Sequence, residues 1–341
     1  MAVPIWKDYF VTLSTSSSIY YRIQLVGDST TTIYQGKAFK RPGQSDITVR
    51  INEVCADFLS HILPTMEHVE FSRMAAPTFL VQTSSSGTGS WTTKDTIQFL
   101  NDWSYDYDYD PATMGLSFPI NGKFDRRQPL VWTGYEVSTI TATIYLKNGT
   151  TYNIYLPVEI SNDFNADFNA DFARSVRAAG SGTAVFYPSE WGDYDKIVIQ
   201  GITFEIVDTC SRYALYYMNA YGGWDSYIIE GNTLEADNLT RYTREVEYDN
   251  RNITNRGKMN YVNEVVKTYT FHTGWLTDDQ ASRMHHLLNS PDVYMYDIAR
   301  EQMIPVVLLG NTTEYKTYKN QGNRMVNYTI QAEVAQSMVR R

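Results

Sequence analysis

Residues 216–227 read YYMNAYGGWDSY. Five aromatic residues surround Gly222 and Gly223, and a Gly-Gly pair between aromatic runs is typical of a tight turn that joins two strands. The segment has no nucleophile beside a base and no metal-ligand spacing, so it predicts a hairpin with a packing role. We expect Trp224 and Trp275 to be packing anchors of the C-terminal domain, and Asp225 to fix the turn by accepting backbone hydrogen bonds. A β-branched residue at Gly223 would resist the positive φ expected in such a turn.

Strand patterns dominate the rest of the chain. Apolar and polar residues alternate over 19–25 and over 326–334, which predicts strands with one buried face. Two more alternating runs flank Asn148-Gly149, a pair that supplies the positive φ angles of a type I′ turn, so 139–156 is predicted to be a hairpin. The 27 tyrosines favour strands, interfaces or both. The predicted fold class is mainly β, with multidomain β-sandwich-like domains and few short helices.

Two short helices are predicted. Thr277 and Gln280 have the spacing of a capping box and precede an apolar stripe, which predicts a helix over 277–288. A second helix is expected at 53–62, with Asn52 as its N-cap.

The length of 341 residues suits about two or three domains. The pattern divides the chain into four consecutive parts. They are an N-terminal β domain with one helix (1–103), an extended connector (104–132), a small β sandwich (133–207) and a C-terminal β-rich domain with the helix 277–288 (208–341).

The charge and the hydropathy pattern limit the partners. A net charge of −9 argues against non-specific nucleic-acid binding, which needs a basic surface to displace phosphate counterions. Acidic residues interrupt the basic residues of 241–258, so we expect a mixed, solvated face there. The chain lacks a secretory signal and an apolar run of about 18 residues, so we expect no membrane span and synthesis in a cytoplasm. Cys55 and Cys210 are expected to be buried free thiols.

The strip 104–110 alternates tyrosine and aspartate. The aspartates suggest a calcium loop, but the glycine and glutamate that an EF-hand needs for its turn and its closure are missing, so a calcium site of another kind is only an alternative. In an extended segment Tyr105, Tyr107 and Tyr109 would face one way. We predict an edge strand or docking arm here, with these tyrosines as interface candidates, and a second arm at residues 1–18.

A repeat of Asp-Phe-Asn-Ala places Phe164, Phe168 and Phe172 four residues apart. On a helix these rings would form one stripe that needs a partner surface, which makes them further interface candidates. A variable surface loop that grew by local duplication is the alternative.

No catalytic signature is present. The five histidines include no His-Glu-X-X-His pair, and the adjacent His285 and His286 are expected at the boundary of a core or in solvent. The chain has no Gly-X-Ser-X-Gly elbow, Walker loop or dinucleotide fingerprint. We therefore predict a non-enzymatic protein without catalytic residues, cofactor or metal. Six tryptophans could instead stack on sugar rings: Trp91, Trp103, Trp132, Trp191, Trp224 and Trp275.

Several short runs resemble those of virion proteins from tailed phages and prophages of gut Bacteroidetes, crAss-like phages included. They are IYQGKAFKRP (33–42), NDWSYD (101–106), PING (119–122), AYGGWDS (220–226), HTGWLTDDQ (272–280) and EYKTYKNQG (314–322). The resemblance implies a structural subunit of a ring in the neck, tail or baseplate, located in the virion after synthesis in the bacterial host cytoplasm. The Asp-Phe-Asn-Ala repeat does not belong to this pattern.

The residues themselves are compatible with such a role. A ring subunit presents a surface to a neighbour on each side, and interfaces favour Tyr, Trp, Met and Arg. The expected partners are other copies of the chain and neighbouring tail or neck proteins, with no specific nucleic acid. A carbohydrate-binding or adhesin-like tail-tip protein is the first alternative. A glycan hydrolase with two carboxylates across a cleft is the second.

Overall fold

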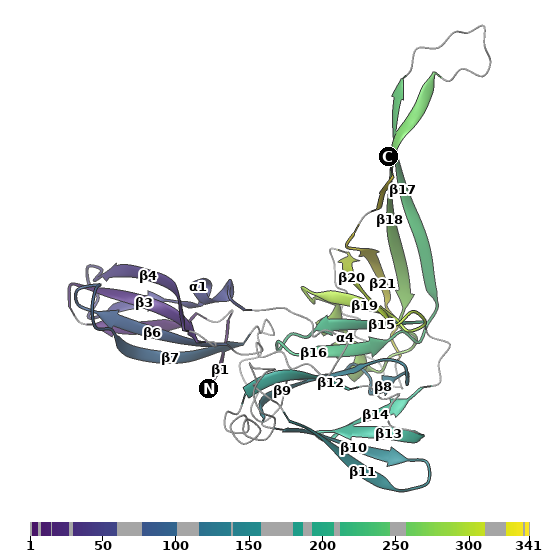
Figure 1. The fold of residues 1–341 in the computed structure, drawn as a ribbon, viewed down its shortest axis with the longest axis horizontal. Helices are drawn as coiled ribbons and strands as arrows, with labels where there is room; N and C mark the ends of the chain where they lie inside the picture. The colour runs from purple at the N-terminus through teal and green to yellow at the C-terminus, as the bar shows by residue number, and fades with distance from the viewer. Residues whose placement is uncertain are drawn as a thin grey trace, which may run out of the picture. The chain divides into compact units, whose positions relative to one another are not determined.

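The computed structural model of the chain describes residues 2–5, 8–14, 16–26, 30–59, 77–100, 116–137, 139–157, 180–186, 193–207, 212–245, 257–310, 325–336 and 338–340. Antiparallel sheets dominate these residues, together with two helices, so the fold is mainly β with β-sandwich-like domains, as predicted (Figure 1). The chain divides into two compact units. The first comprises Met1–Phe118, Pro129–Glu205 and Met218–Asp225, and the second comprises Pro119–Gln128, Ile206–Tyr217 and Ser226–Arg341.

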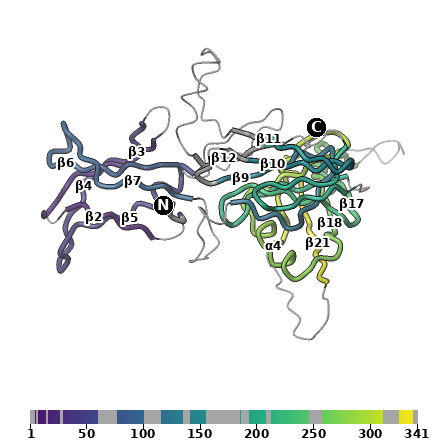
Figure 2. The backbone as a smooth tube through the Cα atoms, turned by 90° about the horizontal axis from the view of Figure 1, so that it is seen from below, coloured from purple at the N-terminus to yellow at the C-terminus, as the bar shows by residue number. Residues whose placement is uncertain are grey.

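The N-terminal part of the first unit contains two sheets. The larger has the strand order β1 (Ala2–Pro4), β7 (Thr92–Leu100), β6 (Thr78–Ser84), β3 (Ser18–Val26) and β4 (Thr31–Phe39), and the smaller pairs β2 (Phe10–Ser14) with β5 (Ile47–Arg50) (Figure 2). Because successive residues of a strand point to opposite sides, each sheet turns one apolar face inward. The shared core includes Val11, Leu13, Tyr21, Ile23, Ile47, Phe79, Val81, Ile97 and Phe99.

The prediction that residues 1–18 form an arm for another subunit is wrong for the described part of that segment. Strand β1 runs parallel to β7, with Ala2 opposite Gln98 and Pro4 opposite Leu100. Strand β2 pairs with β5 in antiparallel register. Both strands therefore complete sheets of their own chain.

The first helix is shorter than predicted and is capped differently. Helix α1 spans Asn52–Ala56, and no side chain caps its N-terminus. The Asn52 amide nitrogen donates instead to the carbonyl oxygen of Ile5 at 3.2 Å, so a tertiary contact replaces the expected local cap. Cys55 of this helix is a buried free thiol, as predicted, and burial raises its pKa to about 12.

A further pair of sheets follows in the first unit. Strand β10 (Thr139–Leu146) lies between β11 (Thr151–Pro157) and β13 (Tyr194–Ile199), β13 pairs in turn with β14 (Ile202–Ile206), and β9 (Leu130–Val137) pairs with β12 (Gly180–Phe186). Trp132 of β9 packs edge-on against Phe204 of β14, with ring centroids 6.0 Å apart. Trp132 is buried, so it is a packing residue and is not available to a sugar.

The hairpin predicted over 139–156 is confirmed, but its turn differs. Strands β10 and β11 pair in antiparallel register. Within the turn only Gly149 has a positive φ, 83°, and its N–H donates to the carbonyl oxygen of Leu146 at 3.0 Å. The connection is therefore a three-residue loop with a glycine bulge, because a type I′ turn would also require a positive φ at Asn148.

The second unit is built on one eight-stranded sheet. Its order is β16 (Trp224–Ile228), β15 (Tyr213–Met218), β19 (Val293–Asp297), β20 (Gln302–Leu309), β21 (Thr329–Val334), β18 (Lys258–His272) and β17 (Thr233–Glu245), with β22 (Met338–Arg340) as an additional strand on β18. The short strand β8 (Lys123–Phe124) also belongs to this unit.

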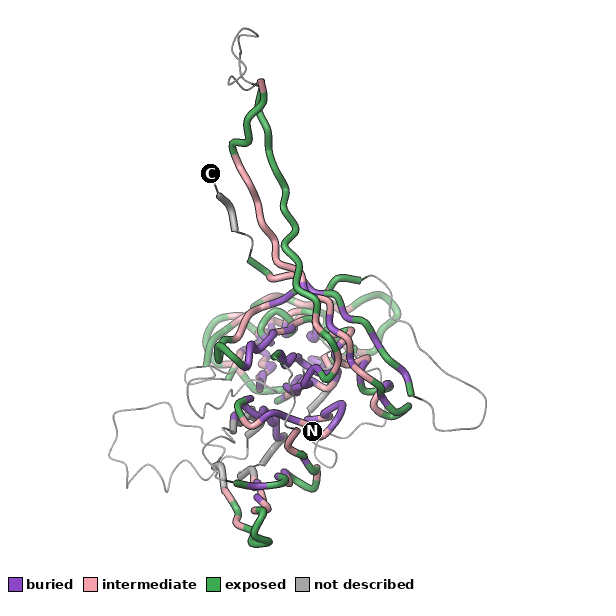
Figure 3. Tube along the Cα trace, turned by 90° about the vertical axis from the view of Figure 1, so that its right-hand side faces the viewer, coloured by how far each residue is buried: buried purple, intermediate pink, exposed green. Residues whose placement is uncertain are grey.

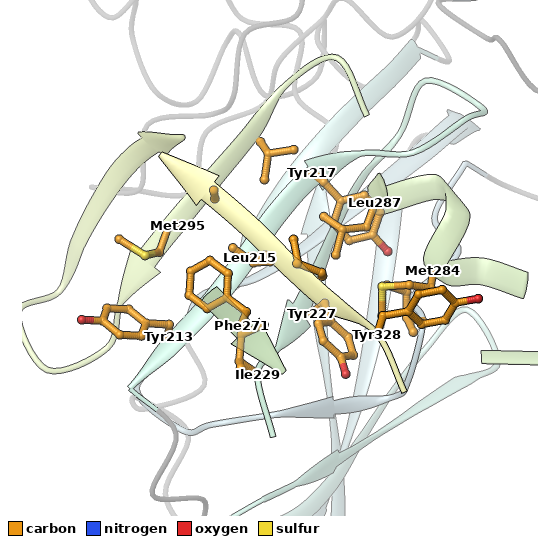
Figure 4. Packing of buried hydrophobic residues seen from close by; sticks show 14 of the residues in the cluster. Tyr213, Leu215, Tyr217, Tyr227, Ile229, Phe271, Met284, Leu287, Met295 and Tyr328 are labelled. Atoms are coloured by element: carbon orange, nitrogen blue, oxygen red, sulfur yellow. The ribbon is translucent and has the colours of Figure 1, made fainter. Parts of the chain in front are cut away.

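Helix α4 (Asp278–Leu288) contributes to the core of the second unit. Figure 4 shows Met284 and Leu287 of this helix among the buried side chains of the sheet, close to Tyr217 and Tyr328. The predicted capping box is confirmed: the Thr277 hydroxyl accepts from the Gln280 N–H, and the Gln280 side chain accepts from the Thr277 N–H.

Many tyrosines serve the chain's own core rather than a partner. Nine of the 27 are buried within the described chain: Tyr21, Tyr194, Tyr213, Tyr216, Tyr217, Tyr227, Tyr269, Tyr296 and Tyr328. Packing within the chain therefore accounts for a third of the tyrosines, and an interface has to be identified from rings that are exposed.

Acidification is expected to destabilise the second unit through His286. Burial, with smaller contributions from His285 and Arg283, lowers the pKa of His286 to about 4. An unfolded chain, with a histidine pKa of about 6.5, binds more protons than the folded protein between about pH 6.5 and pH 4, so the free energy of unfolding falls as the pH drops through that window. The loss is expected to reach up to about 3 kcal/mol.

Urea unfolding at several pH values measures this effect. His286→Gln places a non-titrating amide at the same position, so its free energy of unfolding should depend less on pH than that of the parent protein. The same pH dependence in both proteins would contradict the assignment.

Candidate functional site, the β17–β18 arm

The predicted turn residues Gly222, Gly223, Trp224 and Asp225 lie together between β15 and the start of β16. Gly222 has the positive φ of the turn, 84°. Gly223 has no positive φ, which corrects the reason given for it above. A Cβ at Gly223 would lie 2.0 Å from the carbonyl oxygen of Leu116, so the close approach of two backbone segments requires glycine there.

Asn219, which the sequence patterns did not single out, organises this turn. Its Oδ1 accepts hydrogen bonds from the N–H groups of Tyr221 and Gly223, each at 3.0 Å. Its Nδ2 donates to the Leu116 carbonyl oxygen at 2.6 Å and to Asp225 Oδ2 at 2.7 Å. Asn219 is fully buried. The signal in the sequence is an Asn that begins a glycine-containing turn, where the side-chain amide bonds to backbone groups that follow it.

Asp225 accepts a backbone hydrogen bond, as predicted, from a segment that is distant in sequence. Its carboxylate accepts from the backbone N–H of Phe118, at 2.9 and 3.1 Å. Trp224 is 3% exposed, as expected for an anchor, whereas Trp275 is 65% exposed, so the prediction that Trp275 is a packing anchor is wrong. The turn is thus a structural joint with mutually satisfied polar groups.

Six predicted interface residues lie outside the residues that the structure describes. They are Tyr105, Tyr107, Tyr109, Phe164, Phe168 and Phe172. Cys210 lies outside them as well. These predictions remain open, and the candidate surface comes from another part of the chain.

The hairpin of β17 and β18, called the arm from here on, extends from the eight-stranded sheet (Figure 1). Its register runs from Thr233 opposite Phe271 to Glu245 opposite Lys258. The 13 residues of β17, at about 3.3 Å per residue, span roughly 43 Å. Strand β21 pairs with β18 only along 268–272. Beyond that point, the described chain adds only the three-residue contact of β22 to the arm.

Solvent reaches both faces of the outer arm (Figure 3). Every residue of β17 after Thr233 is exposed, without the alternation of a half-buried strand. Five of the fourteen exposed large hydrophobic residues of the described chain lie on the arm: Leu234, Leu239, Tyr242, Met259 and Tyr261. A two-stranded hairpin with both faces in water is at best marginally stable, so contact with a further surface would stabilise the outer arm.

Two of these residues form an aromatic pair on the outer arm. The rings of Tyr242 and Tyr261 lie with centroids 6.4 Å apart, beside a register shift at Tyr242 and Thr243. Both rings are exposed. Tyrosine is one of the residue types enriched at protein interfaces, because a phenol ring contributes apolar area and a hydrogen-bonding tip.

An ion cluster fixes the root of the arm. Arg212 donates to Glu235 Oε1 of β17 and to Asp297 Oδ2 of β19, each at 3.2 Å. The Tyr213 hydroxyl donates to the same Glu235 carboxylate. Burial, followed by this hydrogen bond, raises the pKa of Tyr213, so the phenol remains a donor at neutral pH. These bonds anchor the root of the arm to the sheet, while the outer part of the arm remains exposed.

The arm is suited to contact with protein. Strand β17 ends the sheet, so within the described chain one of its edges has no partner strand. Arg241, Arg244 and Lys258 are exposed, as is Glu245, so the described part of 241–258 is the mixed, solvated face that was expected; residues 246–256 lie outside the described residues. Among the described residues no group of His, Cys, Asp and Glu could hold a metal ion.

Comparison with known proteins adds no family to this picture. In the part of the chain that the structure describes, no helix has the length and apolar character needed to cross a membrane. No protein-family model matches the chain, and no curated protein matches it either.

Proposed function

We propose that this protein is a structural subunit of a homo-oligomeric ring in the tail, neck or baseplate of a tailed phage, and that it acts by assembly rather than by catalysis. The observation that supports assembly is the arm, which is anchored at its root and exposed on both faces beyond it. The phage setting is supported by the six short runs that resemble virion proteins.

The dimensions of the arm fit a second copy of the chain as its partner. The arm is roughly 43 Å long and, with two strands, roughly 10 Å wide, so its two faces together offer on the order of 800 Å². A stable protein interface buries about 800 Å² on each partner. The arm therefore provides one side of a standard interface when neighbours cover both of its faces.

An arm that lies on a neighbour makes a contact between two different surfaces. Such a heterologous contact repeats around an axis and closes into a ring when the rotation between neighbours allows it. The free edge of β17 can also accept a strand of the neighbour, since its outward N–H and C=O groups have no partner strand within the described chain. Both contributions would cover the hydrophobic residues of the arm.

Sedimentation velocity of the full chain over a range of concentrations tests the proposal. The parent protein is expected to form one discrete oligomer larger than a dimer. The double variant Tyr242→Ser with Tyr261→Ser removes the exposed aromatic pair. Truncation of an interface hot-spot residue costs about 2 kcal/mol or more, so the dissociation constant should rise at least about tenfold.

Trp275→Ser is the matched control, because it removes an exposed aromatic residue, more open to solvent than either arm tyrosine, that does not belong to the arm. This variant should assemble as the parent does. A parent protein that remains monomeric at every concentration would contradict the proposal. If Trp275→Ser weakened the oligomer as much as the double variant does, the contact between subunits would not be specific to the arm.

A further inference from the structure

The outer face of the N-terminal five-stranded sheet, turned away from the core, carries a row of aromatic and cationic side chains. Strand register places Tyr20 opposite Lys37, and Arg22 opposite both Gln35 and Gln82. Because directly paired residues share a face, these side chains lie together on strands β4, β3 and β6. Phe39 belongs to the same face through its pairing with Ser18.

Cations and rings alternate along this row. The Arg22 guanidinium lies 4.6 Å from the centre of the Trp91 ring. The Lys37 ammonium lies 5.0 Å from the ring centre of Tyr20 and 5.3 Å from that of Phe39. Phe39 is 66% exposed, and the rings of Tyr20 and Trp91 are partly exposed. The row therefore presents apolar ring surface and positive charge to solvent together.

Side-chain hydrogen bonds hold the row in place. Arg22 Nε donates to Gln82 Oε1 at 2.8 Å, and Gln82 Nε2 donates to Thr93 Oγ1 at 3.1 Å. The chain of bonds crosses from β3 through β6 to β7. These side chains are already ordered in the free protein. They therefore lose less conformational entropy when a ligand binds than mobile side chains would.

The charge of this face is opposite to that of the whole protein. Strands β3, β4, β6 and β7 contain a single carboxylate, Asp95, and it faces the other side of the sheet, opposite buried Val81 and within 3.2 Å of the Tyr9 hydroxyl. Arg22 and Lys37 therefore have no acidic neighbour on these four strands, in a chain with a net charge of −9. This local positive charge selects an anionic partner.

We propose that this face binds an acidic polysaccharide, such as a polymer of uronic acid. Flat sugar rings stack on exposed aromatic rings through their C–H groups, the glutamine amides can bond to hydroxyls, and Arg22 can bond to a carboxylate with two parallel hydrogen bonds. From β4 to β7 the face spans three strand spacings, roughly 14 Å, which is a site for a chain rather than for one sugar. A nucleic acid is the less favoured partner because its binding depends on neutralising many closely spaced phosphates, and this row offers only the two cations Arg22 and Lys37.

Titration calorimetry of the full chain with polygalacturonate, alginate and hyaluronate tests the proposal. At least one of these acidic polymers should bind, and neutral dextran should bind more weakly. Phe39→Ala combined with Trp91→Ala should lower the affinity at least about tenfold, since this corresponds to about 1.4 kcal/mol for two stacking rings. Arg22→Gln should lower it too and should reduce its dependence on salt concentration.

Phe10→Ala is the matched control, because Phe10 is 59% exposed but lies on the smaller sheet. It should bind as the parent does, and all variants should keep the parent melting temperature and oligomeric state, which separates this proposal from the one for the arm. Absence of binding to all three acidic polymers would overturn it, as would equal loss in Phe10→Ala. Tighter binding of single-stranded oligothymidylate, lost in the same variants, would overturn it in favour of a nucleic-acid site.

Discussion

Gly223→Ala is expected to destabilise the first unit by at least about 3 kcal/mol, at or above the upper end of ordinary overpacking effects. The added Cβ would lie 2.0 Å from the Leu116 carbonyl oxygen and 2.8 Å from its carbonyl carbon, so a backbone segment has to move. Urea unfolding followed by circular dichroism gives the change in the free energy of unfolding, or shows that the variant does not fold.

Gly89→Ala is the control for this prediction. Gly89 has a φ of 94° but no atom within 4 Å of an added Cβ, so alanine there meets only the cost of the left-handed backbone, about 1–2 kcal/mol. A larger effect at Gly89 than at Gly223 would show that backbone conformation, and not the approach of Leu116, decides these sites.

Asn219→Ala is expected to cost about 3–5 kcal/mol of stability. The substitution leaves the N–H groups of Tyr221 and Gly223 without their acceptor, and it removes a donor from the buried carboxylate of Asp225. Each buried polar group without a partner costs about 1–3 kcal/mol, and a buried charge costs more. Asn219→Asp should also destabilise, because it keeps an acceptor but places a second carboxylate beside Asp225.

Asn148→Ala provides a matched comparison. Asn148 also accepts from a backbone N–H two residues later, that of Thr150 at 2.9 Å, but it does so in an exposed turn. Water can replace that bond, so the loss should stay below about 1 kcal/mol. Equal effects at Asn148 and Asn219 would contradict the view that burial makes the Asn219 network essential.

The local elements were predictable because their signals lie within a few residues. The capping box of Thr277 and Gln280 forms as expected, since its two hydrogen bonds join groups only three residues apart. The hairpin around Asn148-Gly149 follows from alternation and a turn pair. The type of that turn was not determined by the pair alone, because a glycine bulge meets the same need for a positive φ at Gly149.

The roles of individual side chains were harder to predict. Trp224 and Trp275 have similar sequence surroundings, each beside a glycine, yet one is buried and the other is exposed. Asn52 would cap a helix in isolation, but it bonds to Ile5, which is 47 residues away in sequence. Such outcomes depend on contacts between distant segments, and no local pattern contains them.

The sequence by itself determined where strands alternate, where the long helix begins and that sheets would dominate, because hydrogen bonds and hydrophobic periodicity act between near neighbours. Only the tertiary structure decided that Gly223 meets Leu116, that the arm of β17 and β18 is exposed on both faces, and that Arg22 and Lys37 share the outer N-terminal face while Asp95, the one acid of strands β3, β4, β6 and β7, lies on the other side. These properties arise when strands distant in sequence pair, and the register of that pairing decides which side chains share a face and which face meets solvent.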